Sequence, residues 1–203
     1  MRRIILTAVV CAFVATSALA DMMIKVQDDI GSTNGGAFKA TVVAGSDPIG
    51  AYLPGSSFQT FCLEAREYLT LGNTYYVKLN TAAIEGGVPG GSDPLSDASA
   101  WVYTQWLDVL DKTVVANANA VQQALWYLEG EDGGVNNTLA QNAVTAVDDG
   151  WKNSNIRVMN MYNDAAYTSR AQDLLVRVVP VPGAVLLGFL GLGYAGMRLR
   201  KRV

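Results

Sequence analysis

The residues with the clearest chemical potential are one cysteine and a pair of glutamines. Cys62 lies in "TFCLE", and Gln122 and Gln123 lie in "VQQALWYLEG". The chain contains no histidine, which excludes a Ser-His-Asp triad, a Cys-His pair and a histidine-ligated metal site. Any chemistry at Cys62 therefore needs a partner other than an imidazole, and neither a cofactor nor a metal is expected.

The N-terminus predicts that this chemistry takes place outside the cytoplasm. Arg2 and Arg3 precede an apolar run over residues 4–14, and a small-x-small sequence ends at Ala20, just before Asp21. This order is typical of a secretory signal peptide, here over residues 1–20, with cleavage between Ala20 and Asp21. The mature protein is therefore expected to be exported.

Export changes the meaning of the cysteine count and of the charge. Cys11 would leave with the signal peptide, so Cys62 would be the lone thiol of the mature chain, without a partner for an intramolecular disulfide. Residues 21–178 carry 18 acidic and 9 basic residues, a formal net charge of −9. An acidic domain of this kind is a poor nucleic-acid binder, because phosphate contacts need clustered Lys and Arg.

The elements that must position Cys62 and the glutamines follow an α+β order. Strands are expected at both ends of residues 21–178 and three helices in the middle, packed on the sheet or forming an inserted helical lobe. Ser96 is the expected N-cap of the first helix and Asn117 that of the second. Predicted strand segments are 36–45, 58–64, a hairpin over 67–79 with its turn at Gly72-Asn73, 155–162 and 171–179; predicted helices begin at Ser96, Asn117 and Thr138.

The two motifs, taken together, resemble the thioester domains of bacterial surface adhesins. Phe61-Cys62 matches the cysteine motif of that family, and residues 121–126, "VQQALW", match its glutamine motif. The resemblance implies an internal thioester between the Cys62 sulfur and the Gln122 acyl carbon, formed with loss of ammonia. Gln123 is the alternative acyl donor, since a slip of one residue turns a helical side chain by roughly 100°.

The chemistry implied by the resemblance is physically reasonable without a histidine. Two side chains held in contact gain an effective concentration on the order of 10⁵ M or more. A helix N-terminus facing Cys62 would favour its thiolate, and Phe61 and Trp126 would shield the bond from water. A nucleophile on a surface or matrix polymer would then attack the acyl carbon. One bond forms per molecule, so the protein is not expected to be an enzyme.

The C-terminus forms a second composite motif. Pro180-Val181-Pro182 precedes an apolar run over residues 183–197, which is followed by a basic stop. This order resembles the PEP-CTERM sorting signal, in a variant with Val181 in place of the usual glutamate. The run is short for a membrane span, and its positive end is consistent with a cytoplasmic terminus. The basic stop consists of Arg198, Arg200, Lys201 and Arg202.

The sorting resemblance implies a delivery route. An exosortase-type enzyme would process the chain near the proline pair, after a transient stay of the C-terminal transmembrane helix in the inner membrane. The expected organisation is a signal peptide over 1–20, a thioester-domain-like ectodomain over 21–178 and a sorting signal over 179–203.

Two other functions remain open at this point. The first is a non-reactive structural protein of the extracellular polysaccharide matrix. The second is a secreted hydrolase, which would need an acid pair such as Glu64 with Glu129 or Asp132. No spacing in the sequence supports that pair beyond its nearness to the helix motif.

Overall fold

A computed structural model describes residues 21–32, 35–84 and 91–178 of the chain. The predicted signal peptide and its cleavage residue Ala20, the residues 180–182 and the basic stop all lie outside these ranges. Asp21 lies inside them, where its carboxylate accepts a hydrogen bond from the Tyr167 hydroxyl at 3.1 Å. In the part of the chain that the structure describes, no helix is both long and apolar enough to cross a membrane.

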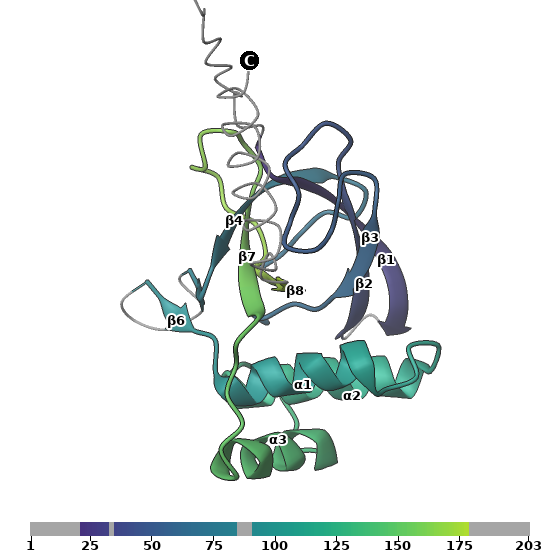
Figure 1. Cartoon of the computed structure of the whole chain (residues 1–203), viewed down its shortest axis with the longest axis vertical. Helices are drawn as coiled ribbons and strands as arrows, with labels where there is room; N and C mark the ends of the chain where they lie inside the picture. Colours follow the sequence, from purple (N-terminus) through teal and green to yellow (C-terminus); the bar gives the residue numbers. More distant parts are fainter. Residues whose placement is uncertain (1–20, 33–34, 85–90, 179–203) are drawn as a thin grey trace, which may run out of the picture.

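The fold is α+β, as predicted, with three helices between two groups of strands. A six-stranded antiparallel sheet has the order β3-β2-β1-β4-β7-β8, and a small ribbon pairs β5 with β6. Helices α1 and α2 lie side by side beneath one end of the sheet, and α3 packs under them as an outer layer (Figure 1). The strands are β1 Met23–Ser32, β2 Gly35–Val42, β3 Ser57–Thr60, β4 Thr74–Asn80, β5 Ala82–Ala83, β6 Asp93–Pro94, β7 Ile156–Tyr162 and β8 Leu174–Arg177.

The helices form where their caps and apolar spacing predict them. Helix α1 spans Asp97–Asp108, and the Ser96 side chain accepts the N–H of Ser99, as expected for its N-cap. Helix α3 spans Thr138–Asp148 and is capped by Asn137. The prediction for α2 was wrong at its start: it spans Val115–Leu128, and its N-cap is Val114 rather than Asn117. Apolar contacts of the helix body outweigh the missing polar cap there.

The strands differ more from the prediction. No hairpin turns at Gly72-Asn73, because the chain before it does not form a strand; β4 pairs with β1 and β7 instead. Strand β1, which was not predicted, lies in the middle of the sheet; among its described side chains only Ile24 and Val26 are buried, and the adjacent Asp28 and Asp29 end the apolar alternation. Sheet pairing joins distant segments, so local spacing predicts it poorly.

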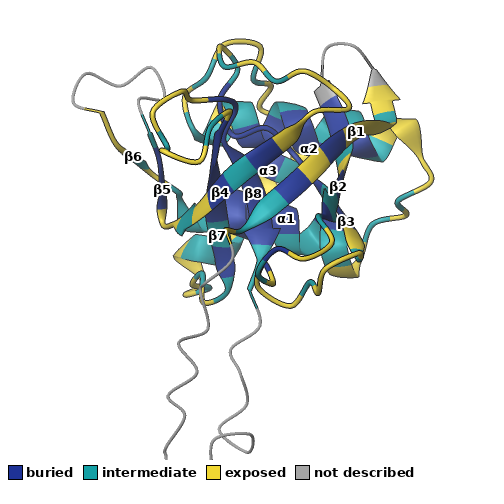
Figure 2. Cartoon of the chain, turned by 90° about the horizontal axis from the view of Figure 1, so that it is seen from above, coloured by how far each residue is buried: buried dark blue, intermediate teal, exposed yellow. Residues whose placement is uncertain are grey.

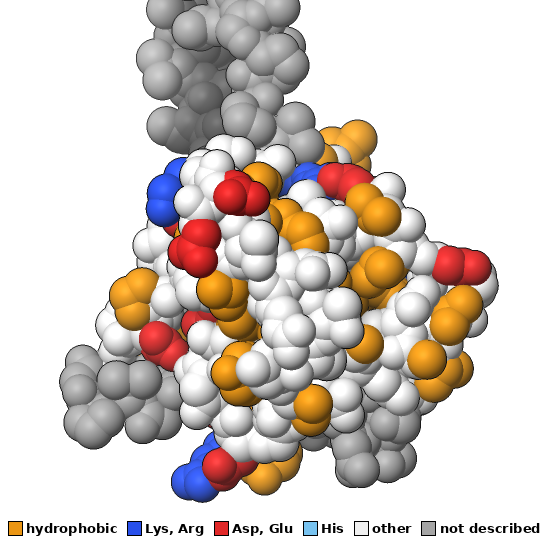
Figure 3. Space-filling model, turned by 90° about the horizontal axis from the view of Figure 1, so that it is seen from below, with side chains coloured by type: hydrophobic (Ala, Val, Ile, Leu, Met, Phe, Trp, Pro, Cys, Tyr) orange, Lys and Arg blue, Asp and Glu red, His pale blue; other side chains and the backbone are white. Residues whose placement is uncertain are grey.

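Two hydrophobic cores lie on the two faces of the sheet. One fills the space between the sheet and the helices and includes Trp106 and Tyr103. The other lines the opposite, concave side and includes Ile24, Val77 and Cys62. Figure 2 shows buried residues running through the strands and the helices where these layers face each other. On the outer face of the helical layer, hydrophobic side chains are scattered among polar and acidic ones (Figure 3).

Candidate functional site

Cys62 lies where the two edges of the sheet approach each other. The chain leaves β3 and pairs with β8 on the far edge, through a bridge between Cys62 and Leu174. The Leu63 N–H donates to the Asp173 carbonyl at 3.0 Å, and the Leu175 N–H donates to the Phe61 carbonyl at 3.3 Å. Because side chains alternate along an extended segment, Cys62 faces the concave core, while Phe61 faces the helices.

Gln122 is held against the backbone of Cys62. The Cys62 N–H donates to Oε1 of Gln122 at 3.1 Å, and Nε2 of Gln122 donates to the Cys62 carbonyl at 2.8 Å. Gln122 is fully buried, and Cys62 is 8% exposed. Two residues sixty positions apart are thus joined by a closed pair of hydrogen bonds. The bond to Oε1 also polarises the Gln122 carbonyl in the sense that an attacking nucleophile requires.

Cys62 and Gln122 open onto one pocket of about 270 Å³. Glu64 and Trp126 also line it. Tyr68, at the mouth, is 81% exposed, so a partner would meet an aromatic rim first. The remaining lining residues are Phe38, Ala65, Glu67, Leu69, Leu71 and Gln172.

The other predicted site residues take different places. Gln123 does not line the pocket, and its carbonyl accepts the Val135 N–H at 3.0 Å. The Phe61 ring packs edge-to-face on Trp106, with centroids 5.1 Å apart, on the side of the strand away from Cys62. Trp126 packs against the same core as Cys62 and lines the pocket. Of the two predicted shields, Trp126 is the one beside the cysteine.

The surroundings of Cys62 favour its neutral form. Burial, and after it the charge of Glu67, raises the pKa of the thiol. Gln122 lies in the middle of α2, about 10 Å along the axis from its first residue, so the helix N-terminus does not lie at this point. The thiolate that a helix dipole was expected to favour is therefore absent, and a reaction at Cys62 needs a group that removes the thiol proton.

Glu64 is the carboxylate nearest to Cys62 in the sequence, and it is the candidate for removing the thiol proton. It is 1% exposed, and its carboxylate oxygens are buried beside the Glu131 carboxylate, with which Glu64 shares a hydrogen bond. Burial, and then the neighbouring Glu131 carboxylate, raises the pKa of Glu64 to about 9. Glu64 therefore carries its proton at neutral pH. The sequence held a signal for it: Glu64 is two residues after Cys62, and alternation places both on one face of an extended segment.

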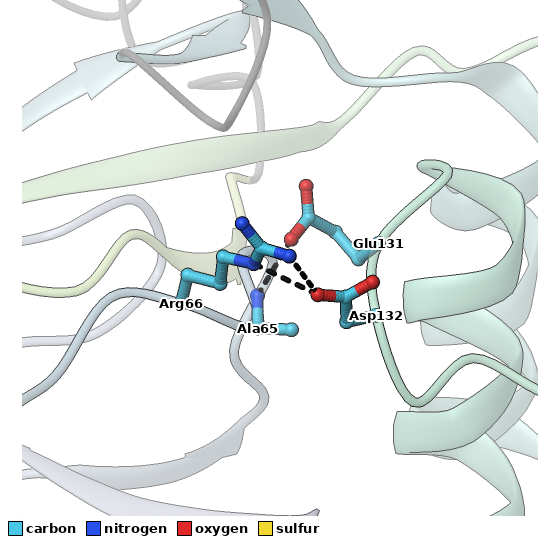
Figure 4. Close-up of polar contacts among 4 residues, drawn as sticks. All are labelled: Ala65, Arg66, Glu131 and Asp132. Atoms are coloured by element: carbon cyan, nitrogen blue, oxygen red, sulfur yellow. Dashed lines mark hydrogen bonds and ion pairs between the residues drawn. The ribbon is translucent and has the colours of Figure 1, made fainter.

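Two contacts tie the segment after Cys62 to the loop after α2 (Figure 4). The Ala65 N–H donates to Oε2 of Glu131 at 3.0 Å. The Arg66 guanidinium pairs with the Asp132 carboxylate, through its Nε at 2.8 Å. The first contact is partly buried, whereas both side chains of the ion pair are exposed. Together they join the segment after Cys62 to the loop after α2.

The acid pairs considered for a hydrolase do not form. Glu129 accepts hydrogen bonds from the backbone and hydroxyl of Ser96, and Asp132 is engaged by Arg66. Glu64 has Glu131 as its neighbouring carboxylate instead. Within residues 21–32, 35–84 and 91–178, no three His, Cys, Asp or Glu side chains are grouped so as to hold a metal ion.

Comparisons with known proteins give one structural likeness. The N-terminal thioester domain of the fibronectin-binding protein SfbI from Streptococcus pyogenes matches at 13% sequence identity and a TM-score of 0.42, over 82% of this chain and 97% of that one. No family model and no curated protein matches the chain. With a TM-score below 0.5, the case for a site rests on the contacts between Cys62 and Gln122.

Proposed function

We propose that the protein attaches covalently to a partner through an internal thioester between Cys62 and Gln122. The observation that carries this proposal is the closed pair of hydrogen bonds between the Gln122 amide and the Cys62 backbone, buried at the base of one pocket. The thiol attacks the amide carbon, the C–S bond forms, and ammonia leaves. A nucleophile of the partner later attacks the same carbon and releases the Cys62 thiol.

The fold favours the formation of this bond in two ways. The strand closure at Cys62 and the mid-helix position of Gln122 fix both groups before reaction, so little conformational entropy is lost in bringing them together. The Cys62 N–H is placed to stabilise the negative charge that develops on Oε1 of Gln122. Trp126 limits the access of water to the acyl carbon.

The proposed place of action is the cell surface or the extracellular matrix. The sequence motifs at the two ends support it, with export by a signal peptide and processing near Pro180-Val181-Pro182 by an exosortase-type enzyme. The partner in this proposal is a surface or matrix polymer that bears an amine or hydroxyl. Each molecule reacts once, so the protein is proposed to act as an adhesin-like attachment protein and not as an enzyme.

Intact-mass measurement of the full chain, with and without methylamine, tests the proposal. The thioester predicts a mass short by one ammonia, which methylamine converts to an adduct on Gln122. Both signals are expected to vanish in Cys62→Ala and Gln122→Ala and to persist in Gln123→Ala, the matched control one position along α2. Export predicts that the chain recovered from the producing cell's surface begins at Asp21.

A full-mass protein whose thiol titrates freely after unfolding would contradict the thioester. Loss of the adduct in Gln123→Ala, with retention in Gln122→Ala, would move the acyl donor to the neighbouring residue. A non-reactive matrix protein, the second reading of the sequence, predicts full mass in all four proteins.

A further inference from the structure

A buried acid whose charged neighbours are all acidic is unusual enough to need an explanation. Moving an ionised carboxylate out of water is unfavourable unless hydrogen bonds or counter-charges replace the lost hydration. Glu64 has no positive partner among the groups that act on it: they are the carboxylates of Glu131, Asp93 and Glu67, and its hydrogen bond is to the carboxylate of Glu131, which requires a proton between the two. The fold thus retains Glu64 as a protonated acid paired with a second carboxylate.

The position of this acid connects it with the reactive pair. Glu64 lines the same pocket as Cys62 and Gln122, and its carbonyl accepts the Gln172 side-chain amide. That bond and the Leu63–Asp173 pairing hold the backbone of the segment on β8. The backbone of Glu64 is therefore fixed beside the pocket in which the acyl carbon would react.

We propose that Glu64 is the proton-transfer group of the Cys62–Gln122 pair, both when the thioester forms and when a partner amine opens it. This inference rests on the thioester of the proposed function. It adds the group that transfers protons when the C–S bond forms and when it opens. A neutral thiol is a weak nucleophile, and an amide nitrogen leaves only once it is protonated. Both problems are solved by one carboxylic acid that accepts a proton on one oxygen and donates from the other.

The steps balance without an added reactant. In formation, Sγ of Cys62 attacks Cδ of Gln122, the thiol proton passes to one oxygen of Glu64, and the proton of the other oxygen passes to the amide nitrogen. The C–S bond forms, the C–N bond breaks, and ammonia leaves. In opening, the amine nitrogen attacks Cδ and gives its proton to Glu64, while the Glu64 proton goes to Sγ. Glu64 ends each exchange as a neutral acid.

Glu64→Gln tests this assignment, because the amide keeps the shape of the side chain and cannot exchange the proton. The rate of ammonia loss after refolding and the rate of adduct formation with hydroxylamine, both read by intact mass, are expected to fall roughly 100-fold. Glu129→Gln is the matched comparison, since it makes the same change at a carboxylate outside the pocket and leaves an oxygen that can accept from Ser96. It is expected to change either rate less than about threefold.

The pH dependence of the rate of adduct formation with hydroxylamine is a second readout. A purely structural role of Glu64 would not produce the dependence described here. Hydroxylamine is uncharged above pH ~7, so its own titration does not intervene in the alkaline range. The wild-type rate, corrected for hydrolysis, should fall as pH rises through the Glu64 pKa of about 9, and the Glu64→Gln rate should not. The wild-type profile needs no variant, so it decides the question even where Glu64→Gln folds poorly.

The outcomes separate the two proposals. A wild-type chain of full mass would overturn both the thioester and the role of Glu64. A wild-type thioester, with Glu64→Gln forming and opening it at the wild-type rate, would overturn only the role of Glu64. Equal slowing in Glu64→Gln and Glu129→Gln would show that the loss of any carboxyl group in this region, and not proton transfer by Glu64, sets the rate, and would likewise overturn the role assigned to Glu64.

Discussion

At the scale of single residues, the pocket combines groups whose neutral forms are favoured by the same cause. Burial raises the pKa of the Cys62 thiol and that of the Glu64 carboxyl, and the acidic neighbours act in the same direction. At neutral pH the site therefore holds a thiol and a carboxylic acid, not a thiolate and a carboxylate. Two neutral groups can be buried without a counter-ion, whereas a buried thiolate and carboxylate would each need one.

The pH dependence of stability is the prediction that belongs to this scale. An unfolded glutamic acid titrates near pH ~4.3, and folded Glu64 titrates near pH 9. Between these values the folded chain holds a proton that the unfolded chain releases, so the free energy of unfolding falls as pH rises. Urea unfolding should show a lower stability at pH ~8 than at pH ~5, with a shallower slope in Glu64→Gln. Identical slopes in the two proteins would contradict the buried acid.

At the scale of elements, the position of Gln122 depends on how α2 is held. The loop after α2 folds back on the helix, and the Gly134 N–H and the Val135 N–H donate to Glu131 and Gln123. A Cβ at Gly134 would lie 2.3 Å from the backbone nitrogen of Tyr127 and 2.7 Å from the carbonyl carbon of Trp126. The helix and its loop are therefore packed backbone to backbone at the residue beside the pocket.

Gly134→Ala is expected to break this packing. The clash is with backbone atoms, which cannot rotate away, so the free energy of unfolding should fall by about 2–4 kcal/mol. Gly130→Ala is the matched control: it lies in the same loop at φ +77° with open space around it, and it should lose only about 1 kcal/mol. Urea unfolding of both variants checks the prediction, and an equal loss in the two would refute it.

At the scale of the whole molecule, the two cores meet at the segment that carries Cys62. Phe61 and Leu63 belong to the core between the sheet and the helices. Cys62 belongs to the core on the opposite, concave side of the sheet. Phe61 packs on Trp106 and, at 6.3 Å between centroids, on Tyr103. The helical layer thus anchors the strand from one side while the pocket opens on the other.

Trp106→Ala is therefore expected to weaken the whole fold. The indole is fully buried, and its removal should lower the free energy of unfolding by about 3–5 kcal/mol. Val144→Ala, on the outer helix α3 at 46% exposure, is the control and should change it by less than about 0.5 kcal/mol. Chemical unfolding, followed by circular dichroism, measures both. A loss at Trp106 no larger than that at Val144 would contradict a shared core.

The sequence by itself determined the local features of this protein. Helical spacing and the Ser96 cap predicted α1, and the alternation of Tyr75, Val77 and Leu79 predicted β4, because these patterns depend on neighbours within a few residues. The absence of histidine and the lone cysteine of residues 21–178 likewise follow from composition alone.

Only the tertiary structure decided what faces Cys62. The hydrogen-bonded pairing with Gln122 instead of Gln123, the turning of Phe61 toward the helices and the burial of Glu64 depend on where α2 and β8 meet the strand. These contacts join segments 60 and 112 positions apart. Contact between such distant segments is set by the packing of the whole chain, which spacing along the sequence does not encode.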